Sequence, residues 1–118
     1  MRSSFVLAAL VSAGWETALA QDVGDSEAGH EIGAQICAPC HAIEPGEGTM
    51  ANPPPLPFDA EVPLPFEDIA NTPGISATAL FAWMRTSHPS MPNIVLEGED
   101  LPNLVAYILS LRREPYRP

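Results

Sequence analysis

The chain contains no lysine and only five arginines in 118 residues, against fifteen aspartates and glutamates. Its formal net charge at pH 7 is therefore −10. Nucleic acids and anionic membrane surfaces bind proteins through positive patches, so this composition argues against both as partners. A partner protein with a basic or apolar docking face suits the charge better, although acidity also aids solubility by itself.

The sequence also lacks an apolar run long enough to span a bilayer. The apolar stretch Phe5–Ala13 follows Arg2 and precedes the small-residue sequence Ala18-Leu19-Ala20. This order predicts an export signal over residues 1–20, with cleavage before Gln21, and an uncleaved amphipathic anchor is the alternative. We then expect residues 21–118 to form a single exported domain without an integral membrane segment, whose core is marginal unaided.

Cysteine is scarce as well, and the two cysteines lie close together in Cys37-Ala38-Pro39-Cys40-His41. A disulfide across so small a loop would stabilise little. A zinc site would have to recruit His30 and His88, which lie at no recognised spacing. A thioredoxin-like redox pair requires βαβ alternation, whereas a proline-rich stretch follows this motif.

Cys-x-x-Cys-His is instead the attachment sequence of c-type haem. Cysteines at i and i+3 of a helical turn reach the two vinyl groups of one porphyrin, and the next histidine reaches the iron. We therefore expect one haem c, covalently bound by Cys37 and Cys40, with His41 as an axial ligand. Export fits this cofactor, because covalent haem is attached on the outer face of the bacterial inner membrane.

The apolar residues follow helical spacing, which predicts an all-α fold. The first helix starts at Asp25 or Ser26, either of which can cap it, and delivers the Cys37–His41 motif at its last turn. The second starts with Ser76 as its N-cap and stops before Pro89.

A third helix is capped by Asp100 or a neighbour. Residues 45–65 hold seven of the fourteen prolines, so they form a long loop, and residues 66–70 add a short helical turn. Such a loop covers a cofactor or forms an interface. The third helix carries an apolar core stripe of Leu101, Leu104, Val105, Ile108 and Leu111.

The sixth position of the iron decides between electron transfer and catalysis. Met91 lies between Pro89 and Pro92, which stiffen its loop and hold the thioether in place. Met84 stands in an apolar helical stripe, where methionine is more often core. The other possibilities are an open position or a ligand from Met50, His30 or His88, of which His88 is the best alternative to Met91.

The order of these features resembles a small class I cytochrome c. The resemblance covers essentially the whole mature chain and rests on the Cys-x-x-Cys-His motif, the Met91-Pro92 loop and the helix over residues 104–112. It implies a class I cytochrome c fold, with about three main helices and a short turn helix around one haem held by His41 and Met91. It also implies a periplasmic, monomeric electron carrier rather than an enzyme. The alternatives are a subunit of a periplasmic dehydrogenase or oxidase, and a haem enzyme or gas sensor with an open sixth position.

In that family the first and last helices cross through a glycine eight residues before the first cysteine, which here is Gly29. Gly33 departs from the larger residue usual at its position, so the crossing is looser there or filled by another side chain. The family's proline carbonyl that accepts a hydrogen bond from the proximal histidine has no clean counterpart. One of Pro53, Pro54 or Pro55 is expected to take its place.

Four further residues are candidates for the haem pocket. Trp83 and Tyr107 either reach the propionates or only pack, and Arg85 either pairs with a propionate or lies on a solvated helix face. Pro92 is a candidate because it directly follows Met91.

Overall fold

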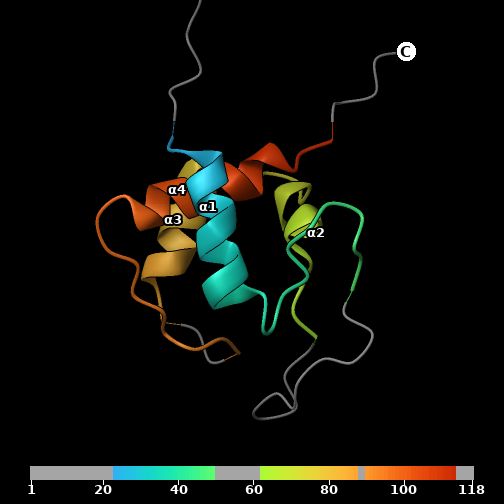
Figure 1. Ribbon diagram of the computed structural model, residues 1–118, viewed down its shortest axis with the longest axis horizontal. Coiled ribbons are helices and arrows are strands. Elements are labelled where there is room, and N and C mark those ends of the chain that lie inside the picture. The colour runs from blue at the N-terminus through green and yellow to red at the C-terminus, as the bar shows by residue number, and fades with distance from the viewer. Residues whose placement is uncertain (1–22, 50–61, 88–89, 114–118) are drawn as a thin grey trace, which may run out of the picture.

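The computed structural model describes residues 23–49, 62–87 and 90–113, and this part of the chain is helical without strands. The all-α prediction is confirmed for these residues. The expected export signal and most of the proline-rich loop lie outside them. The elements are α1 (Ser26–Ile32), the π-helical turn η1 (Gly33–Cys37), α2 (Phe66–Ala70), α3 (Ala77–Arg85) and α4 (Asp100–Ser110) (Figure 1).

The first helix begins as predicted and ends in an unusual turn. The Asp25 carboxylate caps it by accepting hydrogen bonds from the backbone N–H groups of Glu27 and Ala28. The chain then widens into η1, where Ala38 N–H donates to Gly33 O at 2.9 Å, five residues back. Single π turns of this kind occur often at functional sites. This one leads directly into the cysteine motif.

The two central helices agree with the sequence prediction. Residues 66–70 form the short helix α2, and the Ser76 hydroxyl caps α3 by accepting from Ala79 N–H at 3.1 Å. Helix α3 ends at Arg85, before Pro89.

Helix α4 is capped by a neighbour of Asp100, as predicted, but without a side-chain hydrogen bond. The N-cap residue is Glu99, and no side chain hydrogen-bonds to the first turn. Glu99 already has helical backbone angles, and Asp100 N–H donates to Glu97 O at 3.1 Å. A backbone hydrogen bond therefore closes the turn that leads into the helix. The apolar stripe is confirmed as core, with Leu101, Leu104, Val105 and Ile108 buried and Leu111 half-buried.

Helix α1 lies directly against α4 (Figure 1), and Gly29 is the point of closest approach. A Cβ atom at Gly29 would lie 1.9 Å from the Asn103 carbonyl oxygen, so only glycine permits this approach. The Asn103 side chain also accepts a hydrogen bond from Asp25 N–H at 2.8 Å. The close crossing expected at Gly29 is therefore present.

The space beside Gly33 is filled by a side chain from another helix. A Cβ atom at Gly33 would lie 3.4 Å from Phe66 Cε2, and Phe66 is almost fully buried. The larger residue missing from the first helix is thus supplied by α2. Within the described ranges, none of the helices has the length and apolar character needed to cross a membrane.

Candidate functional site: a Cys-x-x-Cys-His turn and a methionine-lined cavity

The cysteine motif forms one tight turn at the end of η1. Cys40 N–H and His41 N–H both donate to the Cys37 carbonyl, at 3.0 and 2.8 Å. Cys37 is buried and Cys40 is half-buried, and neither forms a disulfide. The turn therefore presents two thiols and one imidazole from five consecutive residues, which is the donor set that covalent haem attachment requires.

The protonation of Cys37 argues against a thiol exchange role. Burial and, to a smaller extent, the neighbouring Cys40 raise the pKa of the Cys37 thiol to about 11. Redox-active cysteines of the thioredoxin type need the opposite shift, because the thiolate is the reactive form. At neutral pH Cys37 is a protonated thiol and a poor nucleophile.

The orientation of the His41 ring is set by a backbone carbonyl. Nδ1 of His41 lies 2.7 Å from the carbonyl oxygen of Leu64. A carbonyl can only accept, so Nδ1 carries the proton and Nε2 keeps its lone pair. The Phe66 ring packs beside the imidazole, with 5.5 Å between ring centroids. This is the arrangement of a histidine ready to bind a metal through Nε2.

The expectation that a proline carbonyl plays this role is wrong, because the acceptor belongs to Leu64. Pro53, Pro54 and Pro55 lie outside the described residues. Leu64 precedes Pro65, which favours an extended backbone, and α2 begins only at Phe66. The Leu64 carbonyl therefore has no partner within the helix and is available to His41. The Leu64-Pro65 pair predicts extended backbone before the helix, but nothing in the sequence pairs this carbonyl with His41.

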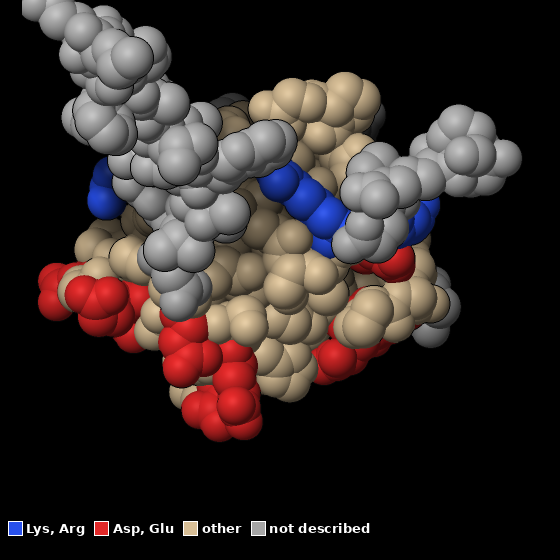
Figure 2. Space-filling view, turned by 90° about the horizontal axis from the view of Figure 1, so that it is seen from above, with Lys and Arg blue, Asp and Glu red and all other residues tan. Residues whose placement is uncertain are grey.

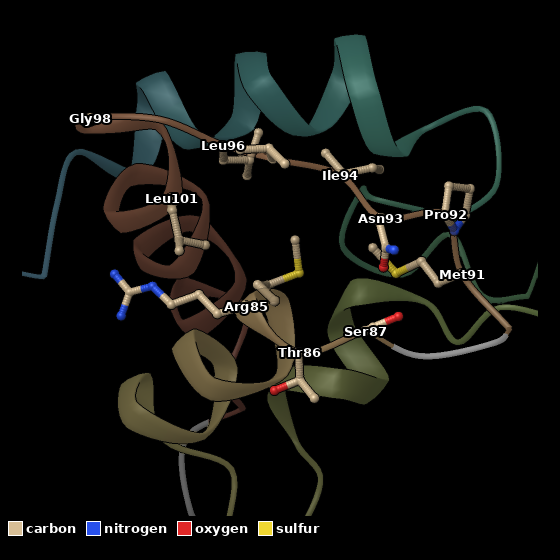
Figure 3. Close-up of a pocket in the computed structure, with 12 residues that line it drawn as sticks. Arg85, Thr86, Ser87, Met91, Pro92, Asn93, Ile94, Leu96, Gly98 and Leu101 are labelled. Atoms are coloured by element: carbon tan, nitrogen blue, oxygen red, sulfur yellow. The ribbon is translucent and has the colours of Figure 1, made fainter.

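A cavity of about 480 Å³ opens between the end of α3, the loop that carries Met91 and the start of α4 (Figure 3). Figure 3 shows the Met91 side chain directed from its loop toward this cavity, which Pro92 and Arg85 also line. Its volume falls in the range of small-molecule and cofactor sites. Met84 lines it too and packs against the core, as the sequence predicted for that residue. The alternative ligands Met50 and His88 lie outside the described residues.

The other candidates for the haem pocket differ in what their side chains contact and in how far they are exposed. The buried Tyr107 hydroxyl donates to Ile43 O at 2.8 Å, so it is engaged within the protein. The Arg85 guanidinium lies over the Phe81 ring, 5.3 Å from its centroid. Trp83 is 55% exposed on α3.

The His30 imidazole, considered above as an iron ligand, has a different partner. Its Nε2 lies 2.6 Å from the Glu44 carboxylate, and its ring meets that of Tyr107 edge to face. Both contacts hold the side chain on the surface of α1. His41 is therefore the histidine of the described residues whose surroundings suit an axial ligand.

No protein-family model, curated protein or solved structure matches this chain.

Proposed function

We propose that this chain is an exported c-type cytochrome of class I, a single-haem electron carrier rather than an enzyme. One observation carries the proposal: on a Cys-x-x-Cys-His turn, His41 Nδ1–H donates a hydrogen bond to the Leu64 carbonyl oxygen and leaves Nε2 available. A disulfide or a thiol exchange centre has no need of this orientation of the histidine.

The donors on the Cys37–His41 turn suit haem c, and Met91 offers a thioether from the wall of the cavity. Cys37 and Cys40 would hold the haem through two thioether bonds, and His41 Nε2 and the Met91 sulfur would bind its iron. Haem iron in such a site supplies a one-electron couple between ferrous and ferric states, at a potential raised by methionine. The Leu64 carbonyl makes the His41 imidazole a better donor.

The proposed reaction is outer-sphere electron transfer, in which no bond is made to a substrate. Partners would bind the surface briefly and by charge or apolar contact. On the face shown in Figure 2, the acidic side chains gather mainly toward the lower edge, and the arginine side chains lie above them. This uneven distribution supports a partner whose docking face is basic.

A subunit role is the second candidate, and exposed apolar residues beside His41 favour it. Val62 is 41% exposed and Leu64 is 56% exposed, on the segment that carries the acceptor for His41. A permanent interface with a periplasmic dehydrogenase or oxidase would cover them. Purification as a monomer without a partner supports the free carrier and contradicts the subunit role.

The ligand assignment is tested by comparing Met91→Leu with Met84→Leu in the full chain. Both methionines line the same cavity, so both variants remove one thioether from it. We expect haem to remain on the denatured chain in both. Only Met91→Leu should lose the long-wavelength ferric absorption band of methionine ligation and lower the reduction potential. A band that survives in Met91→Leu would contradict the assignment, and a chain that never acquires haem would contradict the proposed function.

A further inference from the structure

Residues 64–67, which lead into α2, are hydrogen-bonded to residues 41–46, at and after the end of the cysteine motif. Three hydrogen bonds join these two segments, and we refer to the three bonds as the proximal clasp. They run from His41 Nδ1 to Leu64 O (2.7 Å), from Phe66 N to Ala42 O (2.9 Å) and from Gly46 N to the Glu67 carboxylate (2.8 Å).

The Glu67 bond differs from the other two, because its acceptor is a charged side chain. Gly46 has φ of +74°, a conformation that glycine adopts readily, and its N–H donates to Glu67 Oε2. The other carboxylate oxygen accepts from Arg113 Nε at 3.2 Å, which holds the carboxylate in place. The Gly46 bond and then Arg113 lower the pKa of Glu67, so it is ionised at neutral pH. A charged acceptor makes this the strongest bond of the clasp.

We propose that Glu67 is a positioning residue for His41. Its carboxylate anchors the far end of the loop that starts at the imidazole, while Leu64, three residues earlier, holds the imidazole itself. Without that anchor, the loop moves more freely against α2, and the bond from His41 to Leu64 opens more often. A weaker bond at Nδ1 makes the imidazole a poorer donor, which favours the ferrous iron. The effect on iron rests on the proposed function, whereas the effect on the clasp does not.

Glu67→Ala is the test, and Asp68→Ala is its matched control. Both carboxylates lie in the first turn of α2 and near the Arg113 guanidinium, at 3.2 and 3.8 Å. Each variant removes one negative charge, so the general electrostatic effect on the potential is similar. Only Glu67 bonds to the Gly46 backbone.

The measurements are hydrogen exchange of the His41 Nδ1 and Phe66 amide protons in the reduced full-length protein, and the reduction potential. In Glu67→Ala we expect both protons to exchange about tenfold faster, since a hydrogen bond to a charged group contributes about that factor. The Val105 amide, in the buried part of α4, should keep its rate. The potential should rise further than in Asp68→Ala.

Equal exchange rates and potentials in the two variants would overturn the proposal. It would also fail if the Val105 amide accelerated in parallel, because Glu67 would then stabilise the whole fold. Should Glu67→Ala not fold, Glu67→Gln keeps one acceptor oxygen, and we expect smaller shifts in the same direction; no shift would overturn the proposal. If the wild-type chain carries no haem, the proposed function fails, but the His41 and Phe66 protons still decide whether Glu67 closes the clasp.

Discussion

Replacing Gly29 by alanine would force α1 and α4 apart at their crossing. The added Cβ would lie 1.9 Å from the Asn103 carbonyl oxygen, 2.5 Å from the carbonyl carbon and 2.9 Å from Tyr107 Cβ. Two of these three atoms belong to the backbone and cannot rotate away. Non-bonded atoms rest about 3.5 Å apart, so the helices would have to separate by about 1.5 Å.

The expected cost follows from three contributions. Overpacking against a rigid neighbour costs about 3 kcal/mol, the upper end of its usual range, because the overlap is with backbone. Separation would also weaken the bond from Asp25 N–H to the Asn103 side chain, which contributes about 1 kcal/mol. Alanine returns about 1 kcal/mol through its better helix propensity. We therefore expect Gly29→Ala to lower the free energy of unfolding by about 3 kcal/mol.

Gly33→Ala is the matched control on the same helical segment. Its Cβ would lie 3.4 Å from Phe66 Cε2 and 3.8 Å from the side chains of Ile43 and Leu104, which is ordinary contact. Its stability should stay within about 1 kcal/mol of the wild type, because helix propensity offsets the slight crowding. Urea unfolding of the full chain, followed by circular dichroism, measures both variants. A Gly29→Ala chain as stable as Gly33→Ala would refute the close crossing.

Tyr107→Phe should cost about 1–2 kcal/mol in the same assay, because it leaves the Ile43 carbonyl without its buried donor. Unchanged stability would contradict this role of the hydroxyl. The lowered pKa of Glu67 predicts acid sensitivity: its contribution to stability is present above the ordinary carboxyl pKa of 4.5 and is lost as pH falls through the lower folded value. Urea unfolding across this pH range should show a smaller loss of stability in Glu67→Gln than in the wild type. Identical dependence of stability on pH in the two proteins would contradict the prediction.

Local features of the chain were predictable from the sequence. Asp25 and Ser76 cap their helices through backbone groups only two or three residues away, so neighbouring residues are enough to identify them. The apolar stripe of α4 follows from helical spacing alone. The N-cap of α4 could be placed only at Asp100 or a neighbour, because the turn before Asp100 is closed by a backbone hydrogen bond and no side chain marks the cap.

The candidate site was predictable only in part. The motif itself identifies Cys37, Cys40 and His41, and the flanking prolines single out Met91, which lines the cavity. The sixth ligand stays a prediction that the Met91→Leu experiment tests. The acceptor for His41 was missed, because every residue carries the same backbone carbonyl and Leu64 lies 23 positions away.

The sequence by itself determined the chemistry offered by this chain: two thiols and an imidazole in one short motif, an acidic and lysine-free composition, and apolar residues at helical spacing. These depend on residue types and on near neighbours. Only the tertiary structure decided how His41 is oriented, how closely Gly29 lets α1 approach α4, and that Phe66 fills the space beside Gly33. The reason is physical: each of these depends on the distance between groups far apart in the chain, and packing alone sets that distance.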